Sequence, residues 1–213
     1  MEKAYRNLGF LFLLLLPLTF LGFYKTYFIH FPQFSDQITP FMHSHAAIAC
    51  VWIGMLIAQP LFIRYRKLKW HRRIGKWSYF VFPLLILSFI PQVIRMVKTD
   101  RAIEVFFPAA DAALLILFYS LAIYYRKKHA LHMRYMIGIA IVFLGPTIGR
   151  IGPTLLGWSG NFTQYTQYAI TIFLLTGLMR LDQMHGKKFN PYLIIGLGYA
   201  VHLLVFSALF IWM

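Results

Sequence analysis

Seven long apolar runs dominate the sequence, and each is close to the roughly 20 residues that a helix needs to cross the hydrocarbon core of a bilayer. Only 13% of the residues are charged, whereas a soluble domain carries about 25%. The pattern predicts an all-α polytopic membrane helix bundle. No polar linker divides the chain, so we expect residues 1–213 to form a single transmembrane domain. The expected spans are residues 8–24, 41–63, 77–95, 108–125, 135–156, 164–180 and 191–212.

Positive charge is distributed unequally between the two sets of loops, and this asymmetry predicts the orientation of the chain. Five of the 21 Lys and Arg residues fall on one side: Lys25, Arg95, Lys98, Arg101 and Arg150. The other sixteen, including the cluster in RYRKLKWHRRIGKW (64–77), fall on the side that holds the N-terminus. We therefore expect a cytoplasmic N-terminus and an uncleaved first helix, since no small-x-small cleavage site follows the first run.

The net charge of +15 does not indicate a nucleic-acid partner, because the basic residues occupy short loops between apolar runs. The expected surroundings are a lipid bilayer, with the bacterial cytoplasmic membrane as the expected location. One cysteine, Cys50, lies within an apolar run, which excludes an intrachain disulfide.

Several local signals mark helix starts and kinks. Thr39-Pro40 and Asn190-Pro191 are typical of helix N-termini, and the prolines inside spans predict kinks. These prolines are Pro17, Pro83 and Pro146. The segment GPTIGRIGPTLLG (145–157) predicts a kinked or unwound helix that lines a cavity, or close helix packing by Gly145 and Gly149.

Ionisable residues at membrane depth are costly and are therefore candidates for function. In the expected topology they gather near the outer side: His43, His45, Asp111 and Arg150, with His202 nearer the midplane. Asp111 and Arg150 are expected to form either an ion pair that orients two helices or part of a pocket with the histidines. His43 and His45 diverge by about 200° on a helix, so they are expected to point to different neighbours.

The cytoplasmic side carries a second group of histidines: His71, His129, His132 and His185. One interpretation places them among anionic lipid headgroups. The other makes His71 and His132 the metal ligands of a haem b, with Arg72, Arg73 or Arg134 near its propionates.

A resemblance to a known family rests on two short motifs, His71-Arg72-Arg73-Ile74-Gly75 and His132-Met133-Arg134-Tyr135-Met136. His43 or His45 precedes these motifs, and Arg150 follows them. Over about residues 41–152 the chain resembles a family of uncharacterised bacterial multispanning proteins. That family is similar in pattern to transmembrane cytochromes b of the ferrireductase type, whose haems lie between histidines on four core helices. The resemblance implies haem at this chain's histidines, although its fourth apolar run contains no histidine.

Two functions are therefore considered. The first is membrane electron transfer with haem b and a quinone, quinol or other small reductant. The second is a haem-free transporter, sensor or accessory subunit of a membrane protein partner, using the outer pocket. The sequence contains no GxxxxGK, HExxH or GxSxG motif, so it predicts no catalytic residue.

Overall fold

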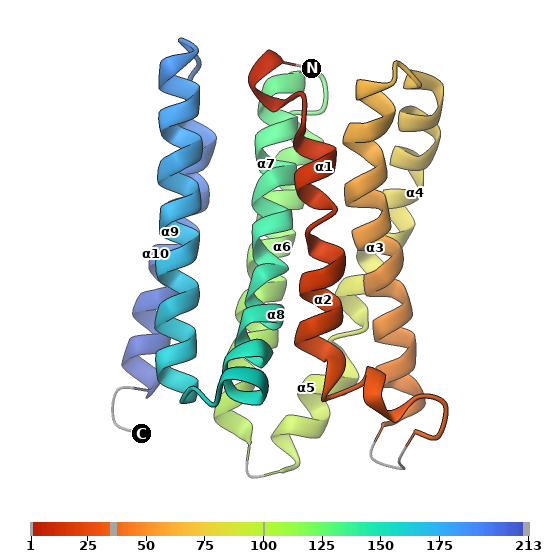
Figure 1. Ribbon diagram of the computed structural model, residues 1–213, viewed down its shortest axis with the longest axis vertical. Coiled ribbons are helices and arrows are strands. Elements are labelled where there is room, and N and C mark those ends of the chain that lie inside the picture. The colour runs from red at the N-terminus through yellow and green to blue at the C-terminus, as the bar shows by residue number, and fades with distance from the viewer. Residues whose placement is uncertain (1, 35–37, 100, 211–213) are drawn as a thin grey trace. The chain divides into compact units, whose positions relative to one another are not determined.

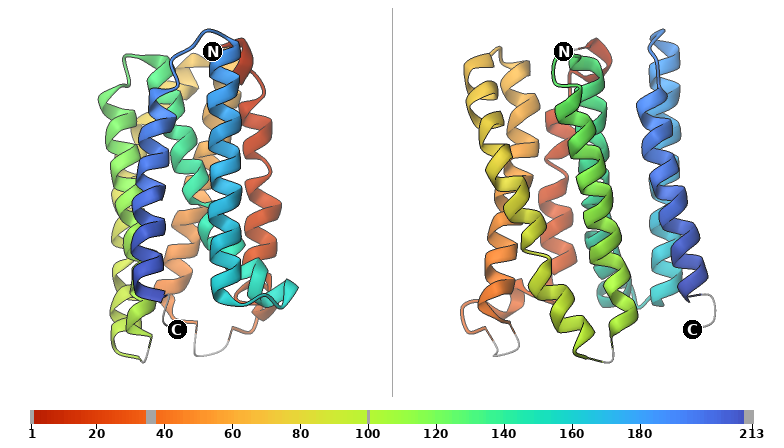
Figure 2. Two further views of the ribbon diagram at one scale, coloured as in Figure 1. Left: turned by 90° about the vertical axis from the view of Figure 1, so that its left-hand side faces the viewer. Right: turned by 180° about the vertical axis from the view of Figure 1, so that it is seen from behind.

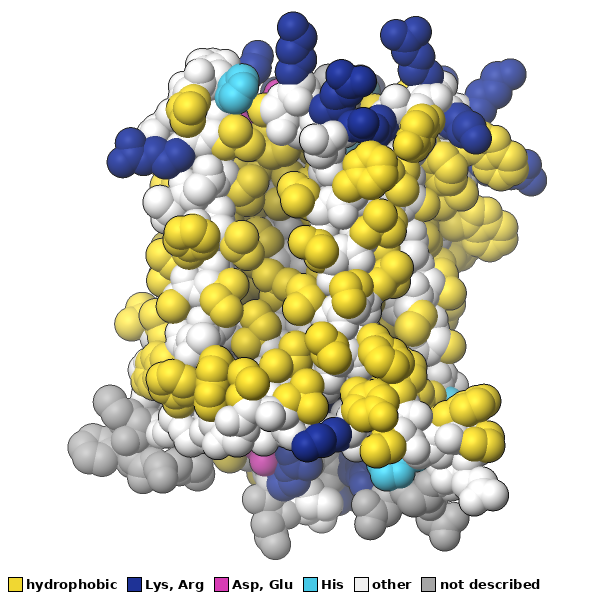
Figure 3. Space-filling view, viewed as in Figure 1, with side chains coloured by type: hydrophobic (Ala, Val, Ile, Leu, Met, Phe, Trp, Pro, Cys, Tyr) yellow, Lys and Arg dark blue, Asp and Glu magenta, His cyan; other side chains and the backbone are white. Residues whose placement is uncertain are grey.

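The computed structural model describes residues 2–34, 38–99 and 101–210, and within these ranges all regular elements are helices. Contacts divide the chain into two compact units, Met1–Ala112 and Ala113–Met213, and each unit is described by itself. Within the described ranges, six helices are long and apolar enough to cross a membrane. Hydrophobic side chains cover the lengths of the helices, and Lys and Arg side chains gather at helix ends (Figure 3). The prediction of an all-α polytopic membrane protein is confirmed.

Among the described residues of the first unit, the α-helices are α1 (Leu8–Phe12), α2 (Leu15–Tyr24), α3 (Pro40–Arg64), α4 (Leu68–Leu87), α5 (Ile90–Val97) and the start of α6 (Phe106–Tyr124). The helices α3 and α4 lie side by side, and α1 packs on α3 (Figure 1). Three short 3-10 helices accompany them: η1 (Lys3–Tyr5), η2 (Phe28–His30) and η3 (Ala102–Val105). The buried rings of Trp52 and Phe82 join α3 to α4, with their centroids 5.3 Å apart.

Proline explains three interruptions of the helices. It lacks an N–H, and its ring clashes with the carbonyl of the residue four positions earlier. Accordingly, α1 gives way to α2 four residues before Pro17, α4 ends four residues before Pro91, and α7 (His129–Val142) ends four residues before Pro146. At Pro83 the helix α4 continues, and the break follows at residues 88–89, so the kink expected at Pro83 stays a prediction.

The basic segment between the second and third spans is mostly helical. It was expected to form a loop up to residue 77, but α4 begins at Leu68 and only residues 65–67 connect it to α3. Lys and Arg are good helix formers, and no Gly or Pro separates Leu68 from the first basic turn. The helix therefore extends beyond the apolar run.

The second unit contains most of α6 (Phe106–Tyr124), followed by α7, α8 (Leu144–Ile151), the π-helix η4 (Gly152–Leu156), α9 (Gly160–Met184) and α10 (Asn190–Phe210). The helix α10 packs on α7 and α9, while α8 and η4 pack on α9 (Figure 2). The interrupted helix expected over residues 145–157 is confirmed, and it ends at Gly157 in the left-handed conformation (φ 68°). The last two residues of the expected span 191–212 lie outside the described residues.

One expected span differs in character from the others. The run 164–180 belongs to α9, which extends over 25 residues, but α9 is not among the six helices that are apolar enough to span a membrane by composition. Its polar side chains explain the difference, and they provide the candidate site.

Candidate functional site

A stripe of polar side chains runs along one face of α9 and is buried inside the second unit. Its members recur at spacings of three or four residues, which places them on a single side of the helix. The polar members are Thr163, Gln164, Gln167, Tyr168, Thr171 and Asp182, and Leu175 is the buried apolar residue among them. The opposite face is mostly apolar and exposed, with Phe173 78% and Phe162 55% accessible. The helix thus presents its apolar face outward and its polar face inward.

The N-terminal end of the stripe is held by the π-helix η4. A Cβ atom added at Gly152 would lie 2.3 Å from Thr163 Oγ1 and 2.9 Å from Thr163 Cβ, so only glycine permits this approach. The Thr163 hydroxyl donates to the Ser159 carbonyl (2.8 Å), and the Ser159 hydroxyl accepts from the Phe162 N–H (3.2 Å) as an N-cap. The irregular end of the fifth span is therefore fitted closely to α9.

In the middle of the stripe, a tyrosine meets a histidine of α10. The hydroxyl of Tyr168 lies 2.7 Å from Nδ1 of His202, and both side chains are buried. Close to this pair, the hydroxyl of Thr171 is fully buried and has no hydrogen-bond partner within the described part of the chain. A buried hydroxyl without a hydrogen-bond partner costs about 1–3 kcal/mol.

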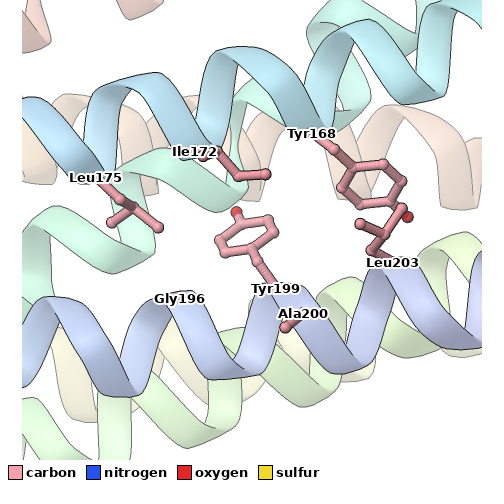
Figure 4. Close-up of a pocket in the computed structure, with 7 residues that line it drawn as sticks. All are labelled: Tyr168, Ile172, Leu175, Gly196, Tyr199, Ala200 and Leu203. Atoms are coloured by element: carbon pink, nitrogen blue, oxygen red, sulfur yellow. The ribbon is translucent and has the colours of Figure 1, made fainter.

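A small cavity of about 100 Å³ lies between α9 and α10, beside the Tyr168–His202 pair. Figure 4 shows the rings of Tyr168 and Tyr199 directed into the space between the two helices. The other residues around it are Ile172, Leu175, Gly196, Ala200 and Leu203. The walls of this cavity are largely apolar, and Tyr168 and Leu175 are the residues of the stripe that line it.

The C-terminal end of the stripe is an ion pair between α9 and α7. Arg134 donates from Nε to Asp182 Oδ2 (2.7 Å) and from Nη2 to Asp182 Oδ1 (2.6 Å), and its Nη1 donates to the Ala130 carbonyl (2.9 Å). Both side chains are almost completely buried, at 2% and 1% exposure. The bidentate geometry is the strong form of this interaction. We expected Arg134 to be available for a haem propionate, but the structure pairs it with Asp182.

His132, one of the two expected haem ligands, is oriented by a backbone carbonyl. Its Nδ1 lies 2.8 Å from the oxygen of Ala122. A carbonyl can only accept, so Nδ1 carries the proton and the lone pair is on Nε2. This is the arrangement that metal-bound histidines adopt, and His132 therefore fits the role of an axial ligand.

His71, the other expected ligand, has a different arrangement. When the Gln59 amide is oriented so that both of its ends are satisfied, its nitrogen donates to Nδ1 and to the carbonyl of His71, and its oxygen accepts from the Gly75 N–H (3.1 Å). Nδ1 then holds the lone pair and Nε2 carries the proton, so His71 in this state does not fit an axial ligand. Arg72 and Arg73 beside it are exposed, and His71 and His132 belong to different units. Among the described residues, no group of three or more His, Cys, Asp or Glu side chains could hold a metal ion.

His43 and His45 point to different neighbours, as the helical spacing predicts. The hydroxyl of Tyr27 lies 2.6 Å from Nδ1 of His43. Burial is the main cause that raises the pKa of Tyr27 above its ordinary value, and the charge interaction with Cys50 is a smaller cause. Nδ1 of His45 instead lies 2.7 Å from the hydroxyl of Ser88, at the break between α4 and α5.

The remaining outer-pocket residues lie in separate parts of the chain. Asp111 is on α6 in the first unit, while Arg150 is on α8 and donates from Nη1 to the Pro146 carbonyl (2.9 Å) in the second. Their ion pair stays a prediction. His202 is paired with Tyr168 in the second unit.

Sequence reasoning overlooked the polar stripe, although a signal for it was present. Residues 163–171 read TQYTQYAIT, which is unusually polar for a membrane span, and Asp182 follows the stripe at helical spacing. Asp182 lies near the C-terminal end of α9, and its side chain is 1% exposed. Its partner was not predictable, because Arg134 lies 48 positions away along the chain.

Comparisons of the chain with models of protein families, with curated proteins and with solved structures find no match. The functional argument therefore rests on the geometry.

Proposed function

We propose that this integral membrane protein is a haem-free transporter that moves a small uncharged polar solute along the polar face of α9. The observation that carries the proposal is the buried stripe, and above all the Thr171 hydroxyl that lacks a partner among the described residues. The proposed location is the bacterial cytoplasmic membrane.

The physical argument concerns the cost of polar groups at membrane depth. Burial of an amide or hydroxyl group without a hydrogen bond costs several kcal/mol in hydrocarbon, about 2–7 kcal/mol depending on the reference state. An apolar face on α9 would pack without this cost. Polar residues directed into the interior of a bundle are typical of substrate pathways, because the solute or its water supplies the missing partners.

The chemistry of the stripe favours an uncharged solute. From Thr163 to Thr171 it offers only hydroxyl and amide groups, together with the Tyr168–His202 pair. The Arg134–Asp182 pair neutralises its own charges at the C-terminal end. In the expected topology this end is cytoplasmic, so the ion pair acts as the inner barrier.

The test is the solute permeability of proteoliposomes, measured by stopped-flow light scattering with glycerol and urea as the probes. We expect permeability above that of protein-free liposomes, and a loss of most of the excess in Gln167→Leu and Thr171→Val. Thr166→Val is the matched control, since the Thr166 hydroxyl donates to the Phe162 carbonyl of its own helix. Folded protein with no excess permeability to either probe would contradict the proposal and favour a sensor or an accessory subunit.

A second candidate function is electron transfer with haem b and a quinol, and the Nδ1–H of His132 favours it. Haem would supply one-electron chemistry, with Nε2 of His132 as one ligand. An absorption spectrum of the purified protein separates the candidates: a Soret band removed by His132→Ala supports electron transfer, and a colourless folded preparation contradicts it.

A further inference from the structure

The first two and a half turns of α4 form a basic helix face. Four cationic side chains, Lys69, Arg72, Arg73 and Lys76, are exposed and lie within a sector of about 100° on a helix with 3.6 residues per turn. From Lys69 to Lys76 the face extends about 10 Å along the helix axis. We refer to these four residues as the basic face.

The opposite side of α4 is fixed against α3, so the rotation of the helix is determined. Gln59 of α3 bonds to the backbone at His71 and Gly75, and further along α4 the buried residues are Ser78, Phe82 and Leu85. This side lies about 150° from the centre of the basic face. The basic face therefore points away from the interior of the first unit.

Two exposed tryptophans, Trp70 and Trp77, lie beside the basic face on the same side of α4. Trp70 is 51% and Trp77 60% exposed, and the guanidinium of Arg73 lies 5.8 Å from the centre of the Trp70 ring. Tryptophan is enriched at the level of lipid headgroups. The apolar stretch Leu68–Val97 contains 30 residues, about 45 Å if straight, whereas the hydrocarbon core is about 30 Å thick. This stretch is therefore longer than the hydrocarbon core, and its N-terminal end holds four of its five cationic residues, which are costly to place in hydrocarbon.

We propose that the basic face of α4 binds the phosphate groups of anionic phospholipids. Charge complementarity supports this occupant, because four cations face outward and the acidic residues nearest in sequence among those described, Glu2 and Glu104, are more than 25 positions away. The flanking indole rings place the cations at headgroup depth, where each Lys or Arg contributes to attraction by anionic lipid.

The experiment measures quenching of tryptophan fluorescence by brominated lipids in nanodiscs. The part of the signal due to Trp70 and Trp77 is isolated by comparison with Trp70→Phe/Trp77→Phe. We expect brominated phosphatidylglycerol to associate at this site at least about threefold more strongly than brominated phosphatidylcholine, and the preference to fall in 500 mM salt. A parallel measurement uses cardiolipin at the same phosphate content as phosphatidylglycerol. It distinguishes one lipid with two phosphates bound across the basic face from separate lipids that each bind one cation.

Arg72→Gln/Arg73→Gln/Lys76→Gln should reduce the preference to about one. The matched control, Arg126→Gln/Lys127→Gln/Lys128→Gln, removes three charges from the loop after α6 and should leave it unchanged. Equal quenching by both lipids in the unmodified protein would overturn the proposal, as would equal losses in the two triple variants. Co-purification of an acidic protein without any lipid preference would also overturn it.

Discussion

Asp182 and Arg134 illustrate how much a single pair of side chains determines in the second unit. Both are buried, and each would be strongly unfavourable alone at membrane depth. Their two short hydrogen bonds fix α9 against α7. The sequence indicates that buried charges need partners, but it does not indicate which partner is chosen, because that depends on how the helices are arranged.

Asp182→Asn should lower the free energy of unfolding by about 3–5 kcal/mol, because it leaves the Arg134 guanidinium buried opposite a neutral amide. The thermal unfolding of the detergent-solubilised protein measures the effect. A double change, Arg134→Leu/Asp182→Leu, should recover most of the loss, since no uncompensated charge remains. A change of less than about 0.5 kcal/mol in Asp182→Asn would show that the pair is unimportant for stability.

At the scale of the elements, the apolar runs predict the helices well, and proline explains where they break. Two helix ends, the N-terminus of α4 and the C-terminus of α9, were not predictable from hydrophobicity. The helix α4 begins at Leu68 because its basic residues favour helix, and the polar α9 extends to Met184 because its polar face is buried against neighbouring helices. Periodicity identifies a polar stripe, but whether that stripe faces lipid or protein is decided by tertiary packing.

Gly152→Ala tests the contact between η4 and α9. The new methyl group would collide with the side chain of Thr163, so we expect a loss of about 1–3 kcal/mol in stability. Gly149→Ala is the matched control, because a Cβ there meets no atom within 4 Å. The additional change Thr163→Ala should recover part of the loss in Gly152→Ala. Equal stability of the two glycine variants would contradict this contact.

At the scale of the whole molecule, the uneven distribution of Lys and Arg predicts a cytoplasmic N-terminus. Reporter fusions after Lys69 and Lys188 should therefore report a cytoplasmic position, and a fusion after Lys98 an external one. The opposite result for all three fusions would invert the topology. The N-terminal part of the α9 stripe would then open toward the cytoplasm.

The central claim is that the polar face of α9 borders a water-accessible pathway. The most direct measurement is the reaction of single cysteines with a membrane-impermeant thiol reagent, in protein with Cys50→Ser as the background. We expect Gln164→Cys, Gln167→Cys and Thr171→Cys to react, although these positions are buried, and Phe173→Cys in the middle of the apolar face to remain unmodified by the water-soluble reagent. Protection of all three stripe positions in folded protein, or equal reaction on both faces, would contradict the claim.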